Sequence, residues 1–381
     1  MTADSRFADL TTPSLLLDEA KMMRNIDRLA DHARALGVSL RPHLKTAKSI
    51  DVARRLLPGG DGPATVSTLA EAEAFFAAGV SDILYAVGIA PQKLPRVLAL
   101  RASGCDLSVI LDNAAQAKEV AKASRETGDP VPVLIEIDSD GHRGGLRPDD
   151  PLLIQIGRIL HEGGAELRGV MTHAGESYTV AGNEAHAKFA EIERAAAVAG
   201  AEALREANLP CPVVSVGSTP TAHAARDLTG VTELRAGVYV FFDLVMAGIG
   251  VCRQDDIALS VLTTVIGHQN DRGWILVDAG WMAMSRDRGT SSQALDQGYG
   301  VVCDDAGNIL HDLVLSSANQ EHGIITRRSG APASMPDLPV GTHLRILPNH
   351  ACATAAQHAH FTVIPAKPDN AIVEWPRFGG W

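Results

Sequence analysis

The sequence predicts an α/β protein, with a (β/α)8 TIM barrel followed by a second, mostly β domain. Short β-rich runs alternate with amphipathic stretches rich in Ala, Leu, Glu and Arg. Alternation sustained over about eight units is typical of a closed parallel barrel. After about Cys252 the alternation ends, and β-rich runs follow one another with few helical stretches between them. We therefore expect the barrel to span residues 25–252 and the β domain to comprise residues 1–24 and 253–381.

The β-rich runs of the first two thirds of the chain number about nine, one more than a barrel needs. We expect strands near 14–17, 38–43, 64–67, 82–86, 107–111, 131–137, 167–171, 213–216 and 232–236. The spare first strand is expected to join the β domain. Helices are expected between the barrel strands near 69–78, 91–101, 113–125, 151–161 and 185–207. In the β domain, strands are expected near 258–267, 274–277, 313–316, 342–347 and 360–365.

Composition restricts the class of partner. The chain has 381 residues, of which 46% are hydrophobic, and a formal net charge of −11. This acidic balance argues against nucleic acid or an anionic membrane surface as a partner. The five cysteines are odd in number and show no CxxC spacing, so they indicate thiols of a reducing compartment. With no apolar leader and no long apolar run, we expect a cytoplasmic protein that acts on a small molecule.

A cluster of basic side chains marks the end of the second expected strand. The segment 38–48 reads Val-Ser-Leu-Arg-Pro-His-Leu-Lys-Thr-Ala-Lys. Alternation along a strand would place Arg41, His43 and Lys45 on one face. Neighbouring cations and partial burial favour the neutral amine of a lysine, which can then attack a carbonyl carbon. Lys45 is therefore a candidate Schiff-base lysine, although an exposed position for both Lys45 and Lys48 stays open.

Polar residues follow several later barrel strands, at the end of a barrel where catalysis takes place. They include Arg143 after 131–137, Thr172, His173 and Tyr178 after 167–171, and Tyr239 after 232–236. The best phosphate candidate is Gly217-Ser218-Thr219, which follows the strand containing Ser215 and opens a helix. Glycine allows close approach of the backbone, and free N–H groups at a helix start attract anions. An ordinary helix N-cap is the alternative reading of these residues.

The β domain contains a candidate metal site at His350-Ala-Cys352, where a strand passes into a loop. In an extended chain the i, i+2 spacing places the imidazole and the thiolate on the same side, and both suit zinc or a similar ion. Two ligands do not complete a tetrahedral shell, so water, substrate or a further residue has to supply the rest. The pattern therefore predicts an open site of the catalytic type.

Seven motifs occur in order along the chain and together resemble one enzyme family. They are Arg-Pro-His43-Leu-Lys45-Thr, Gly-His142-Arg143, Thr-His173-Ala-Gly-Glu-Ser-Tyr178, Ser-Val-Gly217-Ser218-Thr219-Pro, Asp278-Ala-Gly, Glu321-His322-Gly and Pro-Asn-His350-Ala-Cys352. In this order they resemble the fold-type III pyridoxal-phosphate enzymes of the D-threonine aldolase and D-serine dehydratase family. The resemblance covers essentially the whole chain. It implies an alanine-racemase-like barrel, and a homodimer with sites at domain and subunit boundaries.

The resemblance also implies roles for individual residues. Lys45 would be the lysine bonded to pyridoxal 5'-phosphate (PLP), Arg143 would face the ring nitrogen, and His350 and Cys352 would bind a divalent metal (Zn, Mn, Mg or Co). Further cofactor contacts are expected from His43, Thr172, His173, Tyr178, Ser215, Gly217, Ser218, Thr219 and Tyr239. The chain departs from the family pattern at two positions, since Ala47 replaces a histidine of the lysine motif and Met171 stands where some dehydratases have tyrosine.

The implied reaction is dehydration of a D-3-hydroxy amino acid, D-threo-3-hydroxyaspartate or D-serine, to a 2-oxo acid and ammonia. Residues 236–246 and 278–289 look most like the 3-hydroxyaspartate dehydratases of this family. One alternative is retro-aldol cleavage to glycine and an aldehyde, as in the D-threonine aldolases, which tend to show His-x-Asp where this chain has His350-x-Cys352. Another is a non-catalytic PLP-homeostasis protein, although such proteins lack a β domain. A racemase would need a second base, and the sequence identifies none.

Three further residues are candidates for substrate contact. Arg286 and Arg288 precede Gly289 in a loop and would clamp a second substrate carboxylate by paired hydrogen bonds. Solvent-facing arginines are the alternative reading. His322 would position substrate or water, or serve as a structural residue of a turn.

Overall fold

Two compact units make up the protein. In the computed structural model the described residues are 5–329, 335–367 and 369–381, so small parts of the ranges 1–24 and 253–381 lie outside them. One unit, here the barrel unit, comprises Asp27–Gly237 and Phe378–Trp381. The other, here the sheet unit, comprises the residues up to Ile26 and Val238–Arg377. The segment 238–252 thus falls in the sheet unit, whereas the sequence analysis grouped it with the barrel.

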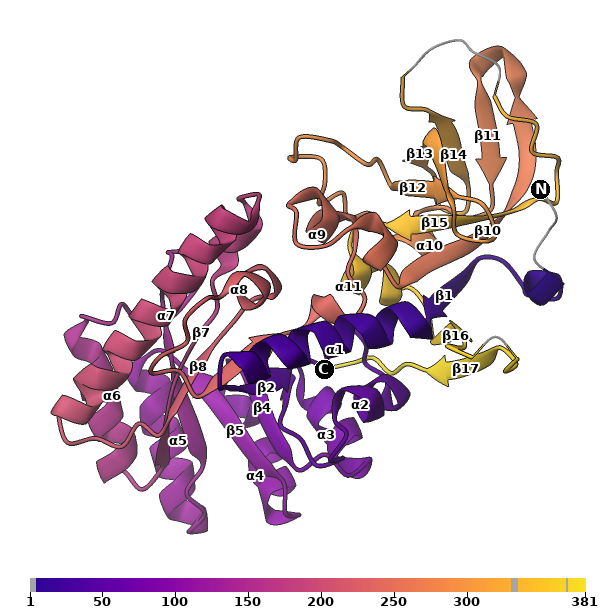
Figure 1. Ribbon diagram of the computed structural model, residues 1–381. Helices are drawn as coiled ribbons and strands as arrows, with labels where there is room; N and C mark the ends of the chain where they lie inside the picture. The colour runs from indigo at the N-terminus through magenta and orange to yellow at the C-terminus, as the bar shows by residue number, and fades with distance from the viewer. Residues whose placement is uncertain (1–4, 330–334, 368) are drawn as a thin grey trace. The chain divides into compact units, whose positions relative to one another are not determined.

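The barrel unit contains an eight-stranded parallel sheet (Figure 1). Neighbouring strands follow the order β2-β9-β8-β7-β6-β5-β4-β3. A parallel bridge between His43 and Thr65 joins β2 to β3 and closes the sheet, which confirms the predicted barrel. The strands are β2 (Ser39–Pro42), β3 (Ala64–Val66), β4 (Asp82–Gly88), β5 (Asp106–Leu111), β6 (Pro132–Ile137), β7 (Glu166–Thr172), β8 (Val213–Val216) and β9 (Glu233–Ala236).

Helices alternate with these strands, as the sequence predicts. They are α1 (Glu19–Ala35), α2 (Ile50–Leu56), α3 (Leu69–Ala77), α4 (Leu94–Ala102), α5 (Ala114–Thr127), α6 (Pro151–Glu162), α7 (Asn183–Glu206) and α8 (Thr219–Ala224). Side-chain caps fix several starts; for example, the Asn113 side chain accepts the N–H of Gln116. The helix expected at 91–101 begins instead as a short 3₁₀ helix, and α4 follows with a proline in its first turn.

The sheet unit is built on a nine-stranded, mainly antiparallel sheet with the order β11-β14-β13-β12-β15-β10-β1-β16-β17. The strands are β1 (Ser14–Asp18), β10 (Leu259–Gln269), β11 (Trp274–Val277), β12 (Gly300–Cys303), β13 (Ile309–Ala318), β14 (Gly323–Arg327), β15 (His343–Pro348), β16 (His360–Ile364) and β17 (Val373–Pro376). β1 pairs with β10 and β16, so the prediction for the spare first strand is confirmed. Strands β12, β14 and β17 were not predicted from the sequence.

Short helices complete both units. The α-helices of the sheet unit's second segment are α9 (Leu244–Gly248), α10 (Trp281–Met284) and α11 (Ala351–Ala355). The 3₁₀ helices are η1 (Ser5–Phe7), η2 (Pro91–Lys93), η3 (Gly175–Tyr178), η4 (Val238–Val240), η5 (Gln254–Asp256) and η6 (Asn270–Arg272). Among the described residues, no helix combines the length and the apolar character needed to traverse a lipid bilayer.

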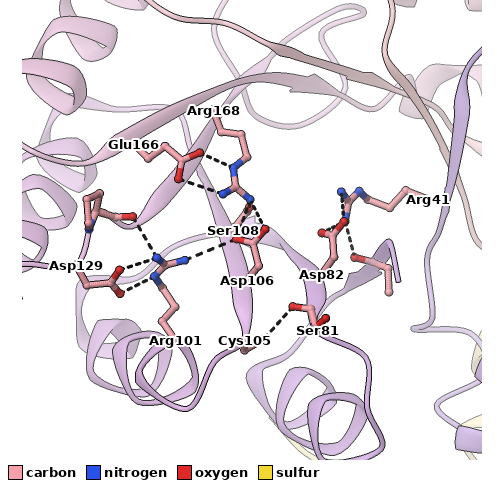
Figure 2. A network of polar contacts seen from close by, with 12 residues as sticks. Arg41, Ser81, Asp82, Arg101, Cys105, Asp106, Ser108, Asp129, Glu166 and Arg168 are labelled. Carbon is pink, nitrogen blue, oxygen red and sulfur yellow. Dashed lines mark hydrogen bonds and ion pairs between the residues drawn. The ribbon is translucent and has the colours of Figure 1, made fainter. Parts of the chain in front are cut away.

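The starts of the barrel strands carry a network of ion pairs (Figure 2). Arg168 of β7 donates hydrogen bonds to Glu166, to both carboxylate oxygens of Asp106 and to the Ser108 hydroxyl, at distances of 2.9–3.1 Å. Arg101 binds Asp129 in a paired arrangement beside it. The expected catalytic residues follow the strand ends instead, so this network lies at the opposite rim of the barrel and contributes to stability.

Candidate active site

Lys45 lies in a turn that follows β2. The strand ends at Pro42, and residues 44–47 turn away from it. This corrects the expectation that Arg41, His43 and Lys45 share a strand face, because the strand alternation stops at the His43 bridge. Arg41 instead forms ion pairs with Asp82 and Glu233. The Lys45 side chain is exposed, and within the described ranges its ammonium group has neither a hydrogen bond nor an ion pair.

Partly buried polar groups support this turn. The ring of His43 accepts the backbone N–H of Lys45 at 3.4 Å and lies 3.4 Å from the Ser67 hydroxyl. Burial, with the charge of Lys45 acting in the same direction, lowers the pKa of His43 well below its usual value. His43 is therefore neutral, and its ring supports the turn without adding a positive charge beside Lys45.

Residues after β7 form a second part of the site. His173 donates its Nδ1–H to the carbonyl oxygen of Gly217 at 3.1 Å, because a carbonyl oxygen only accepts. Burial lowers the pKa of His173 to about 3, with the charges of Lys45 and Arg143 contributing. The ring is neutral at physiological pH, which leaves Nε2 as an acceptor. The Tyr178 ring lies 6.2 Å away, between ring centroids.

Arg143 lies in the loop after β6 and is 58% exposed along its side chain. Its guanidinium group approaches the Glu136 carboxylate at 3.5 Å. Burial raises the pKa of Glu136, and Arg143 opposes that effect. The same loop is held at Gly145, whose N–H donates to the Asp112 carboxylate at 3.0 Å. Arg143 is thus anchored by one weak contact and has most of its donors available.

The turn Gly217-Ser218-Thr219 joins β8 to α8. Gly217 has φ +134°, and a Cβ there would lie 2.0 Å from the carbonyl oxygen of Arg235, so only glycine fits. The Ser218 hydroxyl accepts the N–H of Thr221 and caps α8, as the alternative reading of this motif stated. Thr219 Oγ1 is buried and has no hydrogen-bond partner among the described residues. A buried hydroxyl of this kind calls for a polar ligand or water.

Arg235, one residue before the end of β9, was missed as a functional candidate. It is 4% exposed and donates to the Ser215 hydroxyl and to the Thr172 carbonyl oxygen. The Ser215 hydroxyl in turn donates to Glu233 at 2.5 Å. Two predicted cofactor contacts, Thr172 and Ser215, are therefore tied to a buried cation inside the barrel. Thr172 Oγ1 also donates to Ser139, at 3.1 Å.

In the sheet unit, His350 and Cys352 are joined by a hydrogen bond. They do not lie on an extended segment as expected, since His350 is the N-cap of α11 and Cys352 lies within that helix. His350 Nδ1 donates to Asp287 at 2.6 Å. Burial acts to lower the pKa of His350, but Asp287 and Cys352 outweigh it and raise the pKa to about 11. Asp287, which the sequence analysis missed, orients the imidazole from the loop that carries both candidate arginines.

The donor set at His350 fits a metal ion in one respect. A carboxylate on Nδ1 leaves Nε2 to face the ion, which is the usual arrangement of ligating histidines. Asp243 is buried nearby and accepts the N–H of Ala351 at 2.9 Å, which fixes the start of α11. In the part of the chain that the structure describes, no group of three His, Cys, Asp or Glu side chains gathers closely enough to bind a metal.

The predicted substrate residues and Tyr239 remain to be placed, and both arginines already contact other side chains. Arg288 pairs with Asp296 at 2.5 Å and lies 5.3 Å from the centroid of the Tyr299 ring. Arg286 is exposed and lies over the Trp281 ring at 4.9 Å. The exposed His322 lies between β13 and β14, and Tyr239 is fully buried in η4.

Family models match both parts of the chain. The model "Alanine racemase, N-terminal domain" matches residues 17–245, and a serine dehydratase domain matches residues 258–364. Among curated proteins, D-threo-3-hydroxyaspartate dehydratase of Delftia sp. is 57% identical over 375 residues, 98% of each chain. D-serine dehydratase of Dictyostelium discoideum is 30% identical over 96% of this chain and 95% of its own. D-threonine aldolase of Arthrobacter sp. is 29% identical over 94% and 90%.

Solved structures agree with the sequence relatives. The Delftia dehydratase structure has a TM-score of 0.96 at 56% identity and covers 99% of this chain and 100% of its own. A mutant of the same enzyme, solved in the metal-free form, matches equally well.

Proposed function

Because this chain belongs to the PLP-dependent D-threonine aldolase and D-serine dehydratase family, we propose that it is a dehydratase (ammonia-lyase). Its substrate would be a D-3-hydroxy amino acid, D-threo-3-hydroxyaspartate foremost and D-serine second. Its products would be a 2-oxo acid and ammonia. The 57% identity with the Delftia dehydratase over 98% of both chains carries the proposal.

The barrel residues fit PLP. The buried, unpartnered Thr219 hydroxyl and the Ser218 hydroxyl would bind the phosphate at a turn where Gly217 admits no side chain. Arg143, mostly exposed, would face the ring nitrogen, while His43, His173, Tyr178 and Tyr239 would complete the surroundings. When bound, PLP supplies an aldehyde that joins the substrate amine and a ring that withdraws electrons from Cα.

Lys45 would carry the cofactor and act as the base. Its amino group has no competing partner among the described residues, so it would be free to hold the cofactor. Once released, the neutral amine of Lys45 would remove the Cα proton. An arginine at the ring nitrogen does not readily give up its proton, so Arg143 would leave that nitrogen unprotonated. Loss of the Cβ substituent would then be favoured over accumulation of negative charge on Cα.

His350 and Cys352 would hold a divalent cation, with Asp287 fixing the ring of His350. The ion, when bound, supplies Lewis acidity to the substrate hydroxyl, which is otherwise a poor leaving group. Loss of water from the substrate gives an enamine, and its hydrolysis gives the 2-oxo acid and ammonia. Zn, Mn, Mg and Co all remain candidates, although the thiolate of Cys352 favours zinc over magnesium.

Substrate with a second carboxylate would be recognised by arginine. Arg288 would have to exchange Asp296 for the substrate, and the exposed Arg286 would assist from above the Trp281 ring. His322 would position substrate or water. We further propose a homodimer in the cytoplasm. The five cysteines form no disulfide bond with one another, in keeping with a reducing compartment.

An assay of products distinguishes this proposal from its rivals. The holoenzyme is incubated separately with D-threo-3-hydroxyaspartate and D-serine, and all products are quantified. Ammonia and a 2-oxo acid in equal amounts are expected from the dehydratase. Glycine plus an aldehyde would show an aldolase instead, an outcome for which the 29% identical D-threonine aldolase gives a precedent. Absence of any turnover would favour a PLP-binding protein without catalysis.

A further inference from the structure

Glu193 is a buried carboxylate on the inner face of α7, where its neighbours along that face, Ala190 and Ala197, are also buried. It belongs to α7 and is 1% exposed, whereas Ile192 beside it is 46% exposed. A charged residue is rarely buried unless its partners satisfy it. Its partners come from two loops at the carboxyl ends of the barrel strands.

One oxygen of Glu193 accepts two backbone N–H groups. These are the N–H of Ala174, at 2.9 Å, and the N–H of Gly217, at 3.0 Å. Ala174 opens the segment that leads to Tyr178, and Gly217 opens the turn of Ser218 and Thr219. A single carboxylate therefore joins the two loops that follow β7 and β8.

A third contact extends the hydrogen bonds of Glu193 into α8. Glu193 forms a side-chain hydrogen bond with Thr221. The Thr221 hydroxyl has only one hydrogen, and both the Glu193 carboxylate and the Ser218 carbonyl oxygen, at 3.3 Å, are acceptors for it. The Thr221 oxygen accepts the backbone N–H of Ser218, at 2.9 Å. The hydroxyl of Ser218 lies 2.9 Å from that of Ser177, which donates to the Ala174 carbonyl oxygen. Both loops are thus held by one connected network.

We infer that Glu193 is a positioning residue for the phosphate of the cofactor, a role that rests on the proposed function. The N–H of Gly217 donates to Glu193 and is therefore not available to the phosphate. The phosphate would be bound by groups that follow Gly217 in the turn, including the unpartnered Thr219 hydroxyl. By fixing the peptide of Gly217 and the N–H of Ser218, Glu193 holds these groups in one geometry. Removal of the carboxylate leaves two buried N–H groups without an acceptor and frees the turn.

The test compares two ligands that differ only in the phosphate. Dissociation constants for PLP and for pyridoxal, which has the same aldehyde but no phosphate, are measured by absorbance titration. Glu193→Ala is expected to raise the PLP constant on the order of tenfold, while the pyridoxal constant changes less than about twofold. Glu193→Gln retains an oxygen for the same N–H groups, so it should stay within about threefold of the wild type. Glu202→Ala, at an exposed position of α7, is the matched control.

Equal losses for both ligands in Glu193→Ala, or a glutamine variant as impaired as the alanine variant, would overturn the role. If Glu193→Ala does not fold, Thr221→Val removes only the hydroxyl and should show the same PLP-selective loss, at about threefold; no selective loss in it would also overturn the role. A wild-type protein that binds neither ligand would refute the proposed function itself. If the wild type binds PLP but the variant keeps the same preference for PLP over pyridoxal, only the positioning role of Glu193 is refuted.

Discussion

The ammonium group of Lys48 lies 3.1 Å from the carboxylate of Glu71. Glu71 is 1% exposed, and its other oxygen accepts the N–H of Ser67 at 2.9 Å. Lys48 also accepts the N–H of Phe378 at its carbonyl oxygen. The second lysine of the motif therefore anchors the turn that carries Lys45, and is not a spare surface amine.

Replacement of Lys48 should destabilise the protein. Lys48→Ala leaves the buried Glu71 carboxylate without its cation, which we expect to cost about 3 kcal/mol of unfolding free energy. Lys122→Ala is the control, because Lys122 pairs with Glu126 at 3.9 Å on an exposed helix face; it should change stability by less than about 0.5 kcal/mol. Urea unfolding of the two variants measures the difference, and equal midpoints would contradict it.

Lys45→Ala should abolish the near-ultraviolet and visible absorbance of bound cofactor, because no other amine is expected to hold it covalently. Lys188→Ala removes an exposed lysine of α7 and should leave the spectrum unchanged. Spectra are recorded after dialysis against PLP-free buffer. An unchanged spectrum in Lys45→Ala would mean that another lysine carries the cofactor.

Metal loss should stop turnover while cofactor stays bound. EDTA treatment or Cys352→Ala is expected to remove activity with no change in the absorbance of bound PLP. Asp287→Ala should weaken metal affinity by about 10- to 100-fold, because the His350 ring loses its orienting carboxylate. Affinity is measured by competition with a chelator, with Asp271→Ala, at an exposed position of η6, as control. Full activity in protein freed of metal would exclude the Lewis-acid role.

Buried histidines should make the barrel sensitive to acid. Burial lowers the pKa of His223 to about 4, from an ordinary value of 6.5. Between these values the unfolded chain binds a proton that the folded chain does not, so stability falls as pH falls, by up to about 1.4 kcal/mol per pH unit. His223→Asn retains a donor for the Thr219 carbonyl oxygen and should flatten this dependence. Urea unfolding of the wild type and of His223→Asn at pH 7 and pH 5 gives the change of stability with pH for each protein. The same change in both proteins would rule out the contribution of His223.

The ion network at the strand starts should affect stability alone. Arg168→Ala removes hydrogen bonds to Glu166, Asp106 and Ser108, and should lower the unfolding free energy by about 1–2 kcal/mol, since the acidic partners are half exposed. kcat and the cofactor spectrum should remain those of the wild type. Arg147→Ala, at an exposed pair with Asp149, provides the comparison. A change in kcat/KM at constant temperature would show that the network reaches the active site.

Periodicity predicted the barrel because its strands are regular and apolar. It failed at Lys45, where Leu40 and Leu44 continue the alternation of apolar residues past the last strand residue, Pro42. It also missed β12, β14 and β17, which are only 4 or 5 residues long. β14 and β17 include exposed or partly exposed positions, whereas β12 is buried throughout.

The supporting residues were missed for a different reason. Asp287 and His350 are 63 residues apart in sequence, and no local pattern connects them. Glu193 stands in the run Glu-Ile-Glu-Arg, where hydropathy favours burial of Ile192, yet the structure buries the glutamate. Helical spacing places Glu193 in line with the buried Ala190 and Ala197, and hydrogen bonds from the N–H groups of Ala174 and Gly217 satisfy its carboxylate there. Such reversals are expected where a fold supports chemistry.

The place of β1 in the nine-stranded sheet affects how the chain reaches its folded form. Its hydrogen-bonding neighbours are β10 and β16, which begin at Leu259 and His360. During synthesis, β1 therefore leaves the ribosome long before β16, and both of its edges are covered only after β16 has been made. An uncovered apolar strand is a site for erroneous association between nascent chains. We expect the risk of aggregation to be greatest while the final third of the polypeptide is being translated.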